Sequence, residues 1–573
     1  MRKPARRPSN LIAAVDDPIS LPMAIGMGVQ HCFAMSSGLV LAALIAYAAT
    51  DSVDVASNLV RISMIAAGLG TILQSLKRGP IGSGYLCPNL PGPTFYPASL
   101  LAAQTGGLSL VFGMTLLAGL FQALLSRIIH RLRALLPPEV TGVIVAMVGI
   151  SLIGPGISSI AGIAPGDTQS TALETFAGVS TLLVMFGLSV WGTSFMRLYC
   201  VLIGVAFGYA LEFGLQIVPN TVVDEFRDSG LFSVPDIGLP AAMTFDATLI
   251  LPFLIAGIAS TVKAVGDLST AQKINDEDWV APEMRSIRKG VLADALAVIS
   301  SAVMGGMGQS TSSSNLGVAL ATGVTSRWIG FSAGAIFIVA AFVPALAHVF
   351  VLMPGPVKGA VLVFVACFMI VSGMQLVMSR LMDTRKIFVV GASIIAGLSV
   401  DILPSLYADL DPTLGSLAAS SLSLATVTAI GLNLIFRIGV KRRADFVLEP
   451  DEDREAAVVK FLHDKGALWG ARRDIIQNAA TALVEFVEAS ARSGSLMEDI
   501  RIDAHFDQFR LDIFIHYTGP ALPLPEAAPS LADMDDESDQ MQRLSGFLIR
   551  SAATKAEATR RDNQNTLHLL FEH

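Results

Sequence analysis

Charged side chains are scarce in this sequence. Asp, Glu, Lys and Arg make up 15% of its 573 residues, whereas 53% are hydrophobic. Soluble globular proteins carry about 25% charged residues, so this shortage excludes an ordinary soluble enzyme of this length. The apolar residues gather in runs close to the ~20 residues that a membrane-spanning helix needs. The sequence therefore predicts a polytopic membrane protein.

Reactive and metal-binding patterns are also lacking. The four cysteines stand singly in apolar stretches, without CxxC or metal-type spacing. We therefore expect buried thiols at Cys32, Cys87, Cys200 and Cys367. The sequence shows no activated nucleophile, metal cluster or phosphate-binding loop, which predicts a protein that is not an enzyme and holds no metal. The net charge is −8, and the sequence has no concentrated patch of Lys and Arg of the kind that binds nucleic acid. This argues against a nucleic-acid partner.

Fourteen apolar windows have lengths close to that of a membrane span. Lys and Arg gather after the even-numbered windows, as between Arg127 and Arg133, and short cytoplasmic loops are enriched in these residues. We therefore expect both termini on the cytoplasmic side of a bacterial-type inner membrane. The windows lie at roughly 21–48, 56–76, 82–104, 109–131, 138–157, 171–192, 195–217, 246–268, 287–305, 308–326, 329–350, 354–378, 385–402 and 412–437.

The two halves of the chain share a short motif. Leu136-Pro-Pro-Glu-Val aligns with Met353-Pro-Gly-Pro-Val, 217 residues further on, and the same offset places Gly92 on Gln309. Since seven spans is an odd number, the second half enters from the opposite side, and the pattern predicts an inverted repeat of seven plus seven spans. A chance match is the alternative, because prolines are common at helix starts.

A polar stretch interrupts the tenth window. Six consecutive side chains from Gln309 to Ser314 carry hydroxyl or amide groups. Irregular backbone at membrane depth is tolerated only where protein buries it or where it lines a cavity. A half-length helix that opens near Asn315 would direct unpaired N–H groups and a positive dipole end into that cavity. The stretch 308–327 therefore predicts a substrate site.

Composition divides the chain into three parts. We expect a cytoplasmic N-terminal tail at 1–20, an all-α membrane domain at 21–439 and a soluble α+β domain at 440–573. The two repeats of the membrane domain would cover about 21–217 and 246–437. The expected elements of the last domain are a helix at 468–491, strands at 500–506 and 509–516, a loop at 519–539, a helix at 540–556 and a strand at 566–571.

The membrane part resembles the nucleobase–ascorbate transporters, the family of xanthine, urate and uracil permeases. The resemblance covers about residues 20–437 and implies a core domain and a gate domain, with substrate held between the third, eighth and tenth segments. It also implies alternating access driven by a proton or sodium gradient, and a homodimer. Six motifs carry it in order: Gly28-Val-Gln-His-Cys-Phe-Ala-Met35, Gly92-Pro-Thr-Phe95, Pro137-Pro-Glu-Val-Thr-Gly142, Val265-Gly-Asp267, Asn315-x-Gly317-x-x-x-x-Thr322-Gly-Val-x-Ser-Arg327 and Met353-Pro-Gly-Pro-Val-x-Gly359.

Two positions depart from the family pattern. Lys263 stands where the family usually has a carboxylate that binds the base, and Ser314 stands where it usually has Gln or Glu. A site built to pair particular donors discriminates strongly against ligands that lack them. We therefore expect a purine-type nucleobase such as xanthine or urate, or a related planar anion.

The resemblance and the residue chemistry together assign the candidate site. Lys263 and Asp267 are four residues apart on one helix face, so a structural ion pair is the alternative to binding and proton coupling. Packing alone is the alternative for Phe95. For His31 and Gln30 the alternative is a neutral side chain that is hydrogen-bonded across helices and holds the first segment in place. Arg327 is expected to anchor the chain at the cytoplasmic face. The substrate-binding candidates are Thr94, Phe95, Lys263, Ser312, Ser313 and Ser314; the coupling candidates are Asp267, His31 and Gln30; the structural ones are Asn315, Gly317 and Thr322.

The C-terminal domain weakly resembles the ATP-binding fold of histidine kinases and anti-sigma kinases. Asp474-x-x-x-Asn478 matches the position of that family's Asn box, and the turn at Gly519 matches the position of its glycine turn. The adenine-binding Asp is absent, and the glycine-rich lid is incomplete near Gly546. The resemblance implies a degenerate, non-catalytic domain, with an unrelated α+β module as the alternative. We expect no cofactor other than the coupling ion.

Two functions of other classes remain open on the sequence. One is a channel-like anion pathway of the same fold, and the other is a sensor that signals through the C-terminal domain.

Overall fold

The computed structural model forms two compact units, Met1–Asn433 and Leu434–His573. Residues 6–572 are described, apart from gaps at 10, 51, 133–136, 164–170, 194–195, 198, 218–224, 228–229, 238–242, 280–281, 379–381, 408–414, 416–419, 437–441, 449–452, 470, 472, 493–499, 508–509, 526–536 and 562–563.

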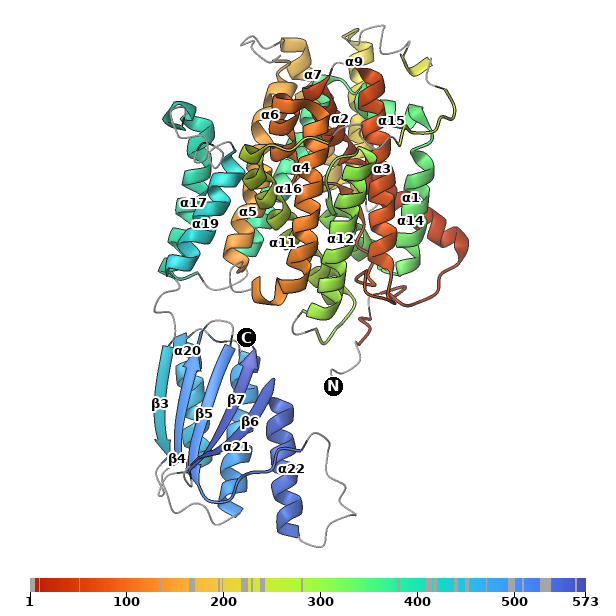
Figure 1. The fold of residues 1–573 in the computed structure, drawn as a ribbon. Helices are drawn as coiled ribbons and strands as arrows, with labels where there is room; N and C mark the ends of the chain where they lie inside the picture. The colour runs from red at the N-terminus through yellow and green to blue at the C-terminus, as the bar shows by residue number, and fades with distance from the viewer. Residues whose placement is uncertain are drawn as a thin grey trace. The chain divides into compact units, whose positions relative to one another are not determined.

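The first unit is a bundle of helices that run alongside one another (Figure 1). Its helices are α1 (Leu21–Ser36), α2 (Leu39–Ala49), α3 (Val53–Ser75), α4 (Tyr96–Leu132), α5 (Pro138–Ser151), α6 (Ile153–Ile160), α7 (Ala172–Trp191), α9 (Cys200–Gly214), α11 (Ile250–Ile274), α12 (Met284–Met304), α13 (Ser313–Thr322), α14 (Arg327–Ala340), α15 (Pro344–Val351), α16 (Gly355–Val377), α17 (Thr384–Ile402) and α19 (Ser421–Phe436), with short 3₁₀ turns η1 (Ala247–Leu249) and η2 (Pro404–Tyr407).

The number of spans differs from the expected fourteen. Among the described residues, seven helical stretches are long and apolar enough to cross a membrane, and an eighth counts if α14 and α15, bent by 87°, form one span. Two further apolar helices, α9 and α19, are shorter, and α13 has only 10 residues. Fourteen spans are therefore not confirmed, because broken and short helices replace several of the expected windows.

The membrane unit is not purely helical. Strand β1 (Asn89–Pro91) pairs antiparallel with β2 (Gln309–Thr311). This pairing satisfies buried backbone N–H and C=O groups of the two strands, as non-helical chain at this depth requires. The expectation of an all-α domain is corrected here, since hydropathy does not distinguish a buried three-residue strand from the start of a helix.

Close helix packing in this unit depends on paired glycines. Gly68 of α3 and Gly334 of α14 face each other: a Cβ added at Gly68 would lie 2.5 Å from the Gly334 carbonyl oxygen, and one at Gly334 would lie 2.6 Å from the Gly68 oxygen. Small residues allow this approach of two helix backbones. The pair fixes the distance between α3 and α14.

We expect Gly68→Ala to lower the melting temperature of the purified protein, with a loss of about 1–3 kcal/mol from overpacking. Gly391→Ala in α17 is the matched control, because a Cβ there meets no atom within 4 Å and Ala favours a helix by roughly 0.5–1 kcal/mol. Equal melting temperatures for the two variants would contradict the packing argument.

The second unit is a two-layer α/β structure. Its antiparallel sheet has the order β3-β4-β5-β7-β6, and its helices contribute to one core with the inward-facing side chains of the strands, among them Ile502, Ile513 and Leu569. The elements are β3 (Arg442–Leu448), α20 (Arg454–Trp469), α21 (Arg473–Arg492), β4 (Ile500–Phe506), β5 (Arg510–Thr518), α22 (Glu537–Ala552), β6 (Lys555–Arg561) and β7 (Gln564–Glu572).

The α+β class and most elements of this unit match the sequence prediction. The expected strands at 500–506, 509–516 and 566–571 correspond to β4, β5 and β7, and the two expected helices to α21 and α22. Strands β3 and β6 and helix α20 were not predicted. The two missed strands lie at the sheet edges, where charged residues replace the apolar alternation that identifies a strand.

Candidate functional site

The strand crossing, meaning the antiparallel pair of β1 and β2, is a buried element of the membrane unit. Asn89 is opposite Thr311, and Pro91 is opposite Gln309. Two more backbone hydrogen bonds extend the pairing, from the Gly92 N–H to the Gly308 oxygen at 2.8 Å and from the Ser312 N–H to the Pro88 oxygen at 2.8 Å. All residues of both strands are buried.

A helix begins within a few residues of the end of each strand. Helix α4 starts at Tyr96, and α13 starts at Ser313 with Ser312 as its N-cap, whose hydroxyl accepts a hydrogen bond from the Asn315 N–H. The half-length helix expected near Asn315 is thereby confirmed. Two positive helix ends lie beside the strand crossing, which favours negative groups there.

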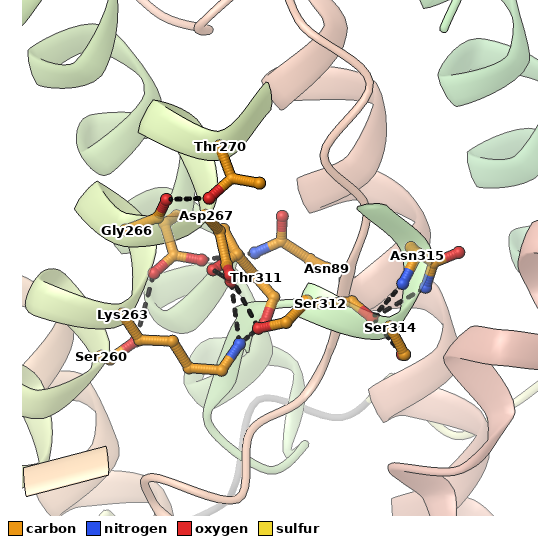
Figure 2. A network of polar contacts seen from close by, with 12 residues as sticks. Asn89, Ser260, Lys263, Gly266, Asp267, Thr270, Thr311, Ser312, Ser314 and Asn315 are labelled. Atoms are coloured by element: carbon orange, nitrogen blue, oxygen red, sulfur yellow. Dashed lines mark hydrogen bonds and ion pairs between the residues drawn. The ribbon is translucent and has the colours of Figure 1, made fainter. Parts of the chain in front are cut away.

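Lys263 and Asp267 form an ion pair next to β2. The Lys263 ammonium lies 2.9 Å from the Asp267 carboxylate and also donates to the Thr311 carbonyl oxygen. Asp267 accepts two further hydrogen bonds, from the Thr311 hydroxyl at 2.6 Å and the Ser313 hydroxyl at 2.7 Å. Figure 2 shows Lys263 and Asp267 of α11 lying beside Thr311 of β2. The pair is nearly buried, with side chains 6% and 10% exposed, and it ties α11 to the strand crossing.

The three expected serines lie at the N-terminus of α13 and differ in exposure. Ser312 is buried, and its hydroxyl lies 3.0 Å from that of Ser314. Ser313 and Ser314 are exposed, and a Cβ added at Gly317 would meet no atom within 4 Å. The face of α13 that carries these hydroxyls is therefore open to a ligand.

Thr94 and Phe95 lie between β1 and α4 and are fully buried. The Phe95 ring packs on the chain at Gly308, where an added Cβ would lie 2.6 Å from the ring. The Thr94 hydroxyl has no hydrogen-bond partner among the described atoms. In this conformation neither side chain reaches the open face of α13.

His31 connects α1 to α13. Its Nδ1 lies 2.6 Å from the Asn315 side-chain oxygen, and the Asn315 amide nitrogen donates to the Ser312 hydroxyl. Because the Asn315 oxygen can only accept, His31 carries its proton on Nδ1. Gln30 is half-buried on the same helix. The third structural candidate, Thr322, donates its hydroxyl to the Val318 oxygen at the end of α13.

The N-terminal segment packs on the far end of α13. Ala13 forms a parallel bridge with Val324. Asp16 pairs with Arg327 and, at 2.8 Å, with Lys77. Arg327 thus holds the N-terminal segment against the start of α14, and its expected place at the cytoplasmic face stays a prediction.

In the C-terminal unit, the segment at Gly546 that resembles a kinase lid lies against Pro523, four residues after the turn at Gly519. A Cβ at Gly546 would lie 1.8 Å from the Pro523 oxygen, and the Tyr517 hydroxyl accepts a hydrogen bond from the Leu522 N–H at 3.1 Å. A nucleotide between these segments would require them to separate.

The family model described as "Permease family" matches residues 23–406, about two thirds of the chain. The chain belongs to this permease family. Xanthine permease XanP of Escherichia coli K12 is 29% identical over 445 residues, covering 75% of this chain and 95% of the relative. A putative purine permease of Clostridium perfringens is 28% identical, covering 75% and 93%. Uric acid permease PucJ of Bacillus subtilis is 26% identical, covering 73% and 93%.

These matches confirm the resemblance to the nucleobase–ascorbate transporters and make the chain a membrane transporter, not an enzyme. Among solved structures, the permease is similar to the transmembrane domain of the cyanobacterial bicarbonate transporter BicA, with a TM-score of 0.46, 13% identity and coverage of 74% and 99%. It is also similar to murine Slc26a9, an anion transporter, with a TM-score of 0.47, 11% identity and coverage of 75% and 71%.

One cluster of this permease was absent from the sequence prediction. Asp294 of α12 is fully buried, and side chains of β1, α4 and α11 donate hydrogen bonds to it. The available signal was an acidic residue inside an apolar window, 287–305, since ionisable residues within the membrane are costly and usually functional.

Proposed function

We propose that the permease is a secondary active transporter that takes up a purine-type nucleobase such as xanthine or urate, or a related planar anion. It works by alternating access, coupled to a proton or sodium gradient. Its membrane domain has fourteen spans in two inverted repeats of seven, some of them broken. It forms a homodimer in the bacterial inner membrane, with both termini in the cytoplasm. Its similarity to a xanthine permease and a uric acid permease supports this substrate class.

The observation that carries the proposal is the network of Lys263, Asp267 and Thr311 beside two helix N-termini. Inverted-repeat transporters bind their substrates where broken helices meet near the membrane midplane. The exposed hydroxyls of Ser313 and Ser314 supply donors and acceptors for the edge of a purine ring. An anionic ring would interact with the Lys263 ammonium and the helix ends, and the buried Phe95 ring would stack on it after a local rearrangement.

A thermal-shift and uptake screen of xanthine, urate, uracil and small carboxylates tests this function. We expect a purine to stabilise the wild-type protein and to accumulate above equilibrium, with accumulation lost on adding an uncoupler. Lys263→Glu should change the ligand profile and weaken urate at least tenfold, because it replaces a cation with an anion. Lys263→Gln is the control that removes the charge alone. Simple equilibration of solute would indicate a channel, and an unchanged profile in Lys263→Glu would refute the role of Lys263.

A further inference from the structure

Asp294 is a buried carboxylate held only by uncharged groups. Its two oxygens accept hydrogen bonds from the side-chain amides of Asn89 at 2.5 Å and Gln122 at 2.6 Å, and from the Ser260 hydroxyl at 3.2 Å. Its exposed fraction is 0%. Within the described residues, no Lys, Arg or His lies within ion-pair distance of it.

The charged groups around Asp294 do not balance its charge. Lys263 is the cation that faces it from α11, and that ammonium is already paired with Asp267. Cys87, which precedes β1, is a neutral thiol buried nearby. The side chains described here on α3, α4 and β2 present uncharged groups to this region, such as Gln122. One ammonium and two carboxylates leave one uncompensated negative charge, and burying it costs several kcal/mol.

Two amide oxygens beside Asp294 have no donor. Asn89 Oδ1 and Gln122 Oε1 are buried without a hydrogen-bond partner among the described atoms. Rotation of the Gln122 amide by 180° would turn this oxygen toward Asp294, where it would accept a hydrogen bond from a protonated carboxyl group. The cluster thus offers donors to the carboxylate and an acceptor to the acid. The N–H and O–H groups that point at Asp294 would repel a metal cation, so the ligand that fits is a proton.

The cluster is connected to the substrate network by two short links. Asn89 pairs across the strands with Thr311, whose hydroxyl and carbonyl groups hold Asp267 and Lys263. Ser260 lies three residues before Lys263 on α11, on nearly the same helix face. A change in the hydrogen bonds of Asp294 therefore acts directly on both elements of the substrate network.

We propose that Asp294 is the site of the coupling proton, which it binds on one side of the membrane and releases on the other. This inference rests on the proposed function. The sequence prediction places the proton on Asp267; the structure favours Asp294, because Lys263 already neutralises Asp267 whereas no cation among the described residues pairs with Asp294.

Asp294→Asn in the full-length protein tests the proposal, because Asn resembles the protonated acid in shape and charge. In proteoliposomes we expect this variant to bind radiolabelled xanthine within about threefold of wild type and to exchange internal for external xanthine. It should not concentrate xanthine under an imposed pH gradient, and its exchange rate should not depend on pH. Gly391→Ala in α17, which lies outside this cluster and has room for a Cβ, is the control and should still concentrate xanthine.

The possible results separate the two proposals. If wild type does not concentrate any nucleobase, the proposed function fails and this inference with it. If wild type and Asp294→Asn both concentrate xanthine under a pH gradient, only the inference is refuted. Where Asp294→Asn does not fold, Gln122→Met replaces it: losing a donor to the carboxylate favours the protonated form, so the pH of half-maximal uptake should rise by about one unit, a tenfold change in proton affinity. An unchanged pH profile would also refute the inference.

Discussion

Asp267→Asn is expected to abolish uptake and to lower the free energy of unfolding by about 3–5 kcal/mol, the cost of removing one partner of a buried ion pair. The Asp267 carboxylate accepts hydrogen bonds from Lys263, Thr311 and Ser313. An amide in its place leaves the Lys263 ammonium buried without an anion. A melting curve in detergent and an uptake assay measure the two effects.

A double variant separates charge from shape. Combining Lys263→Met with Asp267→Asn removes both charges, and replacing a buried pair by uncharged groups is often neutral for stability. We expect the melting temperature to return to within a few degrees of wild type while uptake remains absent. If Asp267→Asn alone is as stable as wild type, Lys263 must pair with another anion. Asp267 would then not be the group that neutralises Lys263 in the folded protein.

Phe95→Ala is expected to destabilise the membrane unit by about 3–5 kcal/mol, as large-to-small substitutions of buried aromatic residues do. The Phe95 side chain is fully buried against the backbone at Gly308. Its removal leaves a cavity where β1 leads into α4, next to the strand crossing. Thermal melting of the purified variant measures the loss.

Phe95→Leu distinguishes packing from stacking on the substrate. Leu preserves most of the apolar volume, so the stability loss should stay below about 1.5 kcal/mol, but it has no ring. A tenfold or larger loss of xanthine affinity in this stable variant would support the predicted stacking, and unchanged affinity would leave Phe95 a packing residue. A Phe95→Ala variant as stable as wild type would contradict the packing described here.

The sequence was most informative where polar residues interrupt apolar ones. The run from Gln309 to Ser314 predicted a broken helix, and the structure places the start of α13 at Ser313. Hydropathy could not show that the residues before that start form a strand with Asn89 to Pro91, because three buried residues carry no periodic signal. In the same way, the spacing of Lys263 and Asp267 predicted that they share a helix face but not that both also bind Thr311.

The sequence by itself determined the class of this protein: a charge-poor membrane transporter with a permease signature at 315–327 and a separate α+β domain. These features depend on composition and on local spacing, which the chain order alone records. Only the tertiary structure decided which buried charges are neutralised. Lys263 meets Asp267 and Thr311, whereas Asp294 meets three uncharged groups from β1, α4 and α11. Its partners Asn89 and Gln122 are 205 and 172 residues away in the chain, so the balance of charge around Asp294 exists only in the folded protein.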